Sequence, residues 1–130
     1  MGNRAVIEFE NTGTGVYLHW NGGKDGIDPL LAVAKEYVIP TSENPPADLV
    51  QVIKNTFDNQ MTIEFNSIDQ LDCDNFDNGV YVIDLNFNIV DRKYNKHPEQ
   101  NEYDFDGFVE FVKSKNDKYF IDGKKQPDWS

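Results

Sequence analysis

Apolar and polar residues alternate at the start of the chain. Between residues 5 and 10 the odd positions hold Ala, Ile and Phe, and two of the three even positions hold Glu. A period of two is typical of a β-strand that turns one face inward. Residues 11–15, which include two glycines, separate this strand from a second apolar and aromatic run at residues 16–20. The N-terminal segment is therefore predicted to be a β-hairpin.

Two amphipathic helices are predicted next. Apolar residues recur at helical spacing from Ile27 to Val38, behind Asp28 and Pro29, a pair that suits a helix cap and first turn. A proline-containing connection follows, and a second apolar stripe marks a helix at about residues 47–58. The apolar faces of these two helices must pack against another layer of the fold, such as a sheet.

The second half of the chain returns to strands. Residues 61–66 alternate again and predict a third strand. Residues 80–85 and 89–93 are predicted to form a second hairpin across Asn86-Phe87-Asn88, because asparagine tolerates the left-handed backbone of a tight turn.

A third helix is predicted near the C-terminus. Asp104 suits its N-cap, and Phe105, Phe108, Val109 and Val112 recur at the spacing of an inward face. Residues 119–121 suggest one more short strand.

The order of these elements predicts the fold class. Strands and helices do not alternate as they do in a parallel α/β fold, and the chain contains no repeat or heptad. We expect an α+β fold, with an antiparallel sheet of four or five strands, two hairpins and about three helices packed on one face. Residues 1–122 are predicted to form a single domain and residues 123–130 a flexible tail.

Composition supports a folded, cytoplasmic protein. The 130 residues are 38% hydrophobic and include nine Phe, six Tyr and two Trp, whereas disordered acidic chains are poor in aromatics. Cys73 is the only cysteine, which excludes an intrachain disulfide and a zinc site of several thiolates and fits a reducing compartment. The longest wholly apolar run is residues 30–34, and the first residues form no apolar signal region. We therefore expect no contact with a membrane.

The distribution of charge along the chain is the most informative feature for function. The chain carries a net charge of -11, and residues 69–110 hold eleven acidic residues against three basic ones, a local net charge of -8. Such a concentration can repel nucleic acid, attract a basic partner, bind cations or keep the protein soluble. Direct nucleic-acid binding is disfavoured, since the basic residues cluster only weakly.

The acidic residues form the first candidate site. Residues two apart on an extended segment point the same way, so Asp72 and Asp74 could begin a row of carboxylates that occupies a basic nucleic-acid-binding surface of a protein partner. The candidate partner-binding residues are Asp69, Asp72, Asp74, Asp77, Glu99, Glu102, Asp104 and Asp106. The competing interpretation is a solvated acidic face that serves solubility, and Asp104 and Asp106 also suit the start of a helix.

The string VYLHWNGG, residues 16–23, forms the second candidate site. It could place Tyr17, His19, Asn21 and Asp25 beside a glycine loop that leads into a helix and binds a small molecule or an anion. Neither a Walker loop nor a dinucleotide fingerprint is present. The alternative is a structural loop with an ordinary strand histidine.

Catalytic and metal motifs are weak. Cys73 could pair with His19 or His97, but their separation in sequence says nothing of proximity, and carboxylates are too numerous to single out an acid/base pair. In an EF-hand register that starts at Asp72, Phe76 falls on position 5, which needs an oxygen ligand. Residues 72–79 are interpreted as an Asp/Asn turn before a strand at Val80, with a looser calcium site left open. We predict no enzyme activity, cofactor or metal.

Three strings carry a resemblance. NRAVI (residues 3–7), VYLHWNGG (16–23) and LDCDNFDNGVYVI (71–83) resemble small proteins of unknown function from phages and other mobile elements of Gram-positive bacteria. The resemblance covers about two thirds of the chain and departs at Phe76, where glycine is expected, and in the lysine-rich segment after Lys113. It assigns no role to any residue.

This resemblance implies a setting in which small acidic proteins are often inhibitors of host defence. Anti-CRISPR and anti-restriction proteins are similar in size and charge. The expectation is a phage-type inhibitor that mimics DNA and binds a CRISPR effector or restriction nuclease in the cytoplasm of a bacterial host. The small-molecule or anion-binding protein, with or without enzyme activity, is the alternative.

Overall fold

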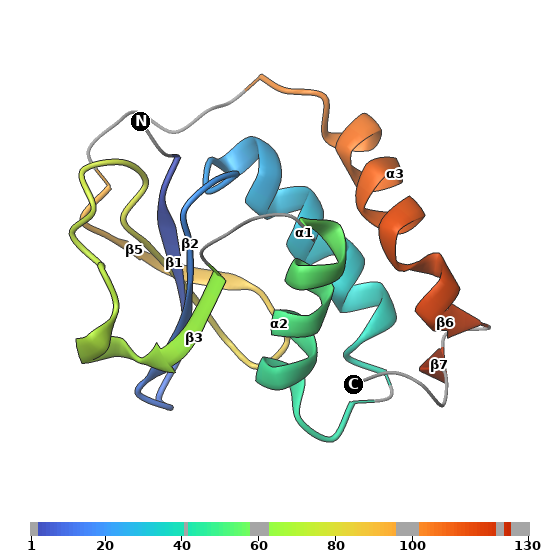
Figure 1. The fold of residues 1–130 in the computed structure, drawn as a ribbon, viewed down its shortest axis with the longest axis horizontal. Coiled ribbons are helices and arrows are strands. Elements are labelled where there is room, and N and C mark those ends of the chain that lie inside the picture. Colours follow the sequence, from blue (N-terminus) through green and yellow to red (C-terminus); the bar gives the residue numbers. More distant parts are fainter. Residues whose placement is uncertain (1–2, 41, 58–62, 96–101, 122–123, 126–130) are drawn as a thin grey trace.

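A five-stranded sheet organises the molecule, in the strand order β3-β2-β1-β4-β5 (Figure 1). The structure is a computed structural model that describes residues 3–40, 42–57, 63–95, 102–121 and 124–125. The strands of the sheet are β1 (Ala5–Phe9), β2 (Thr14–Leu18), β3 (Ile63–Ser67), β4 (Val80–Ile83) and β5 (Ile89–Lys93). The helices are α1 (Lys24–Tyr37), α2 (Pro45–Thr56) and α3 (Phe105–Asn116), and β6 (Phe120–Ile121) pairs with β7 (Lys124–Lys125).

The predicted α+β class is confirmed, and so are both hairpins. β1 pairs with β2, and β4 with β5, in antiparallel fashion, whereas the central pair of β1 and β4 is parallel. The parallel pair was not predicted. It arises because the chain leaves β2, forms α1, α2 and β3, and returns beside β1 in the direction of β1, a pairing that only a long crossover allows.

The helices cover one face of the sheet. Ile7 and Phe9 of β1 and Val16 and Leu18 of β2 point to this side and are buried against α1 and α2. α3 packs on α1 and α2 on their side away from the sheet, so that the helices form two further layers (Figure 1). Alternation on the strands and helical spacing on α1 and α2 thus create one continuous core.

The opposite face of the sheet, called the outer face below, has a second and smaller apolar cluster. Val6, Val80 and Val82 form it, and Ile68 and Leu71 from the connection between β3 and β4 pack against it. Residues 69–77 of this connection are called the acidic loop. A loop therefore takes the place of a helical layer on the outer face.

α1 begins earlier than predicted. Lys24 is its first residue and Gly23 its N-cap, so Pro29 lies inside the helix instead of in its first turn. The extra turn forms because the carbonyl of Gly23 accepts hydrogen bonds from the N–H groups of Gly26 and Ile27, at 3.0 and 2.9 Å. Pro29 has no N–H, so α1 lacks the hydrogen bond to the carbonyl four residues earlier. Pro29 is buried, and this burial offsets part of the loss.

The third helix starts where it was predicted. The carboxylate of Asp104 accepts a hydrogen bond from the N–H of Gly107 at 3.0 Å and caps α3. Val112 is buried and Phe108 and Val109 are half-buried, but Phe105 is 39% exposed, in contrast to its predicted inward position. Phe105 borders a shallow hollow with Leu31 and Lys35 of α1, so its ring is only partly covered.

The turn between β4 and β5 also differs in detail from the prediction. Phe87, and neither neighbouring asparagine, adopts the left-handed conformation, with φ of 64°. Its side chain is fully buried in the core, while the carboxylate of Asp84 accepts hydrogen bonds from the N–H groups of Asn86 and Asn88 at 2.9 Å each. Burial of the aromatic ring and these bonds offset the backbone strain.

Some predictions concern residues outside the described ranges. Met61 of the predicted third strand is one, and so are His97, Glu99 and most of the tail. Within the described ranges, no helix has both the length and the apolar character that crossing a bilayer requires.

Candidate partner-binding site

The acidic loop is held on the outer face by a buried side chain. Asn75 is only 1% exposed, and its amide makes four hydrogen bonds to the backbone of the same connection. Its Nδ2 donates to the carbonyls of Asp72 and Gly79 at 2.9 and 3.4 Å, and its Oδ1 accepts from the N–H groups of Asp77 and Gly79 at 3.1 and 3.0 Å. The segment is the predicted Asp/Asn turn, and it leads directly into β4 at Val80.

An ion pair ties the same loop to β1. The Oδ2 atom of Asp77 lies 2.7 Å from the Nε of Arg4 and 3.1 Å from its backbone N. Both side chains are half-buried. Asp77, one of the predicted partner-binding residues, thus has its charge offset by Arg4 inside the protein.

Beside the acidic loop lies a depression of about 510 Å³, within the range of ligand-binding clefts. Apolar side chains and carboxylates share its lining. The lining residues are Glu8, Ile68, Asp69, Leu71, Asp72, Cys73, Asp74, Val80, Lys93 and Tyr94. Of these, Lys93 pairs with Glu8 at 3.4 Å, while Asp69, Asp72 and Asp74 are exposed at the surface.

The pKa of the Cys73 thiol reflects the electrostatic potential in this depression. Burial raises its pKa, and the carboxylates of Glu8 and Asp72 raise it further, against a smaller opposing effect of Lys93. A group whose anionic form is disfavoured by its neighbours lies in a region of negative potential. The same region would stabilise a cation.

Two exposed aromatic side chains belong to the segments around this depression. Phe76, in the acidic loop, is 70% exposed with φ of 64°, and Tyr94, at the end of β5, is 53% exposed with φ of 58°. Large exposed apolar residues held in a left-handed backbone are rare, because both features cost free energy. The site prediction missed both residues. The one signal was Phe76, which stands where the resemblance led us to expect glycine, the residue that a positive φ favours.

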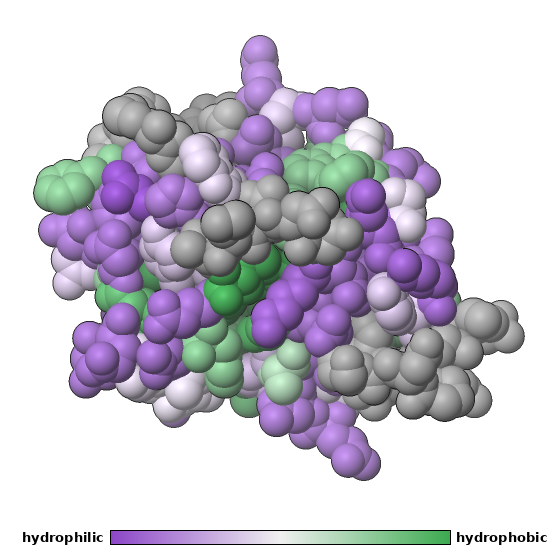
Figure 2. Space-filling model, in the orientation of Figure 1, coloured by the Kyte–Doolittle hydropathy of each residue, from purple (hydrophilic) through white to green (hydrophobic). Residues whose placement is uncertain are grey.

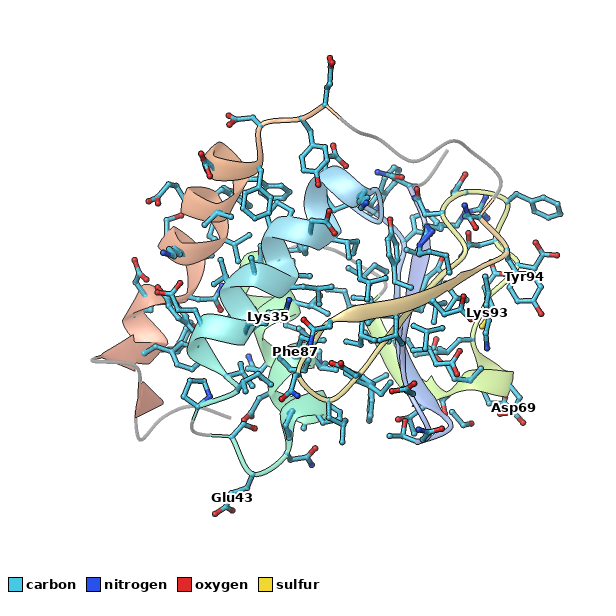
Figure 3. The ribbon with its side chains drawn as sticks, turned by 180° about the vertical axis from the view of Figure 1, so that it is seen from behind. Lys35, Glu43, Asp69, Phe87, Lys93 and Tyr94 are labelled. Atoms are coloured by element: carbon cyan, nitrogen blue, oxygen red, sulfur yellow. The ribbon has the colours of Figure 1, made fainter. Side chains whose placement is uncertain are left out.

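The predicted acidic residues do not form one surface. Asp69, Asp72 and Asp74 lie on the outer face, whereas Glu102, Asp104 and Asp106 lie at the start of α3 in the helical layers. Figure 3 shows the separation, with Asp69, Lys93 and Tyr94 on one side of the molecule and α3 on the other. The acidic residues therefore form two separate areas, one in the loop before β4 and one at the start of α3.

The structure brings part of the second candidate site to the outer face. The hydroxyl of Tyr17 lies 2.9 Å from Nδ1 of His19. Burial raises the pKa of Tyr17, Asp72 raises it further, and Arg4 opposes the shift. Tyr17 also packs against the outer-face cluster, as do Leu71 and Cys73 of the acidic loop. Two segments that were treated as alternatives in the sequence meet in space.

Asn21 and Asp25 belong to the segment that leads into α1. Asn21 occupies the turn before α1 with φ of 63°, and Asp25 belongs to the first turn of α1. Of the four residues predicted for a ligand site, the structure joins two by a direct contact.

Gly22 of this loop has a packing role. A Cβ on Gly22 would come within 2.6 Å of both Cβ of Ala5 and the carbonyl oxygen of Asn3, and the N–H of Gly22 donates to that carbonyl at 2.8 Å. The hydroxyl of Tyr81 donates to the carbonyl of Gly22 at 2.8 Å. Close backbone contact with β1 and β4 therefore accounts for glycine at position 22 without a bound anion.

Neither a metal site among the described residues nor a known relative identifies the chemistry of this surface. Within the described ranges, no three His, Cys, Asp or Glu side chains gather as a metal site. Comparison with protein-family models, curated protein sequences and solved structures finds no match to this chain.

Proposed function

We propose that this protein is a non-enzymatic inhibitor of the phage type, whose outer face binds a basic nucleic-acid-binding surface of a host defence nuclease. One observation carries the proposal. Asp69, Asp72 and Asp74 line a depression that also has an apolar lining and includes the exposed ring of Tyr94, and the same acidic loop carries the exposed ring of Phe76.

This combination matches what a protein interface uses. Carboxylates at the margin steer a basic partner toward the surface and discriminate against acidic ones. Affinity comes mostly from a few buried aromatic or arginine side chains. A plain solubility surface needs the charge but gains nothing from exposed aromatic rings, so the pairing of the two favours binding.

The first experiment measures binding to CRISPR effectors and restriction nucleases with matched variants. The site variant combines Asp69→Asn, Asp72→Asn and Asp74→Asn. The control combines Glu102→Gln, Asp106→Asn and Glu110→Gln, which removes the same charge from exposed residues on or beside α3. The site variant should weaken binding by about tenfold or more and the control by much less. Equal effects of the two variants would show that only total charge matters.

Salt and competitors refine the test. Binding should weaken between low and high salt, since exposed charges are screened over about 10 Å at 0.1 M. Competition by guide RNA or target DNA would identify mimicry, whereas its absence with retained inhibition would identify binding elsewhere on the nuclease. A plasmid-interference assay across several defence systems supplies the biological readout, and no inhibition in any of them would contradict the proposal.

The ligand-binding alternative has less support. The contact of Tyr17 with His19 favours it, but close packing explains the glycine at position 22 without a ligand. A thermal-shift screen with nucleotides and phosphates tests this alternative directly, since a ligand that binds the folded protein raises its melting temperature.

A further inference from the structure

The two edge strands of the sheet differ in their protection against pairing with another strand. β5 has a register shift opposite Val82 and Ile83 and ends in Arg92 and Lys93. Bulges and basic residues are features that discourage an added strand. β3 pairs with β2 in a regular register and contains no proline, lysine or arginine. In the part of the chain that the structure describes, β2 is its only neighbouring strand, so no described strand pairs with its other edge.

The hydrogen bonds show which backbone groups point to that edge. The N–H of Ile68 donates to the carbonyl of Gly13 at 2.9 Å, in line with the β2-β3 register. Bonded and non-bonded pairs alternate in an antiparallel ladder. Glu64 and Asn66 therefore direct their backbone groups toward β2, and the three odd-numbered residues of β3 direct theirs away from the sheet.

We infer that β3 pairs with β3 of a second copy of this chain, antiparallel, about a two-fold axis at Phe65. In this register Phe65 faces its own counterpart, Ile63 faces Ser67, and Glu64 faces Asn66. All five residues of β3 then have a partner, and the two Phe65 residues exchange both backbone hydrogen bonds. The N–H of Ser67 already donates to Oδ1 of Asn66 at 2.8 Å, so the new bonds that cost no existing one are those donated by Ile63 and Phe65.

The side chains of β3 fit this register. Glu64 and Asn66 form a non-hydrogen-bonded pair, in which side chains are closest, and an amide then faces each carboxylate. Within one chain, Nδ2 of Asn66 already donates to Oε2 of Glu64 at 3.1 Å. Phe65 is 45% exposed, and apolar side chains gather beside β3 and α2 in Figure 2. Pairing would cover part of this apolar area.

The inference does not rest on the proposed function. A two-fold pairing of this kind joins two sheets into one and keeps the helices of both copies on the same side. Both outer faces, with their acidic loops, then lie on the other side. The net charge of -11 on each copy opposes association, so the dimer should form more readily at high salt.

Sedimentation velocity at several protein concentrations, in 0.05 M and 0.5 M NaCl, tests the pairing. We expect a dimer that strengthens with salt. Asn66→Asp places a carboxylate against each Glu64 and should raise the dimer Kd by about 3- to 10-fold, while Asn66→Lys places an ammonium there and should lower it by a similar factor. The controls Asn95→Asp and Asp91→Asn make the same changes in charge beside or on β5, and should have smaller effects.

Hydrogen exchange provides a second measurement that does not depend on any variant. The amides of Ile63 and Phe65 should become more protected as protein concentration rises, while those of β5 should not. A wild-type protein that stays monomeric at both salt concentrations overturns the inference. So does a dimer whose Kd responds equally to the substitutions at Asn66 and to their controls, because β3 would then lie outside the interface.

Discussion

The two faces of the sheet are stabilised in different ways. On the helix side, a large cluster of buried apolar residues from strands and helices forms the core. On the outer face, the cluster centres on Val6, Val80 and Val82, and the acidic loop above it is fixed by the amide of Asn75 and the ion pair of Arg4 with Asp77. The charged surface of this protein is thus held in place by a few polar contacts and a small apolar cluster, and not by a deep core.

The largest effect should come from the helix side. Phe9 is fully buried there, and Phe9→Ala should lower the free energy of unfolding by about 3–5 kcal/mol. Leu71 is half-buried on the outer face, and Leu71→Ala should cost less than about 2 kcal/mol. Urea denaturation of both variants measures the contrast. Similar losses would mean that the two faces contribute equally to stability.

Substitution of Gly79 probes how closely the end of the acidic loop packs against the residues that follow β5. It has φ of 66°, and an added Cβ would lie 2.1 Å from the carbonyl oxygen of Lys93. Gly13 has a similar φ of 72° but open space around it. We expect Gly79→Ala to cost roughly 3 kcal/mol or more and Gly13→Ala about 1 kcal/mol, since the second change adds only backbone strain. Equal losses in thermal or urea unfolding would refute the close packing.

Asn75 tests the polar support of the loop. Asn75→Ala leaves buried backbone groups without their partners and should cost roughly 2–3 kcal/mol. Amide exchange should accelerate in residues 72–79 before it does in β1. Asn95→Ala, at an exposed position after β5, is the control and should leave both measurements near wild type.

Two substitutions of Phe76 distinguish its effect on stability from its effect on binding. Phe76→Gly relieves the left-handed strain and should stabilise the protein by up to about 1 kcal/mol, while Phe76→Ala removes the ring but keeps the strain. Both should weaken binding to a nuclease partner if the ring takes part in the interface. Unchanged binding in both variants would restrict the interface to the carboxylates.

The smallest expected effect concerns Cys73. Because burial and the nearby carboxylates raise the pKa of its thiol, less thiolate is present in the folded protein than in the unfolded protein at pH 8. Iodoacetamide should therefore react faster after unfolding. Asp72→Asn should lower the pKa and speed alkylation of the folded protein by a few-fold at pH 8. The carboxylate Glu102 near α3 offers the control, Glu102→Gln, which should leave the rate unchanged.

Local patterns predicted most of the elements correctly. Alternation identified β1 and β3, and an apolar run at residues 16–20 identified β2, which begins two residues earlier at Thr14. The cap at Asp104 identified the start of α3, and the Asp/Asn turn was placed before β4. The errors have local physical reasons. Pro29 suggested a helix start, but the backbone of Gly23 begins α1 one turn earlier. Asparagine was expected to take the left-handed position of the second hairpin, and burial gave that position to Phe87.

The candidate site could be predicted only in part. The sequence pointed to Asp69, Asp72 and Asp74, but it could not separate them from Asp77, whose charge is offset by Arg4 more than 70 residues earlier in the chain. It also missed Phe76 and Tyr94, because a pattern of residue types does not reveal which aromatic rings remain exposed.

The periodicity of the strands and helices, the α+β class and the excess of negative charge can be read from the residues alone. Those properties depend on residues close together in the chain, or on composition. The parallel pairing of β4 with β1, the placement of the acidic residues on two sides of the molecule and the packing of Tyr17 beside the acidic loop follow from the folded structure. The reason is that each of these depends on which distant segments pack together, and packing is settled by the burial of apolar area and the pairing of buried polar groups across the whole chain.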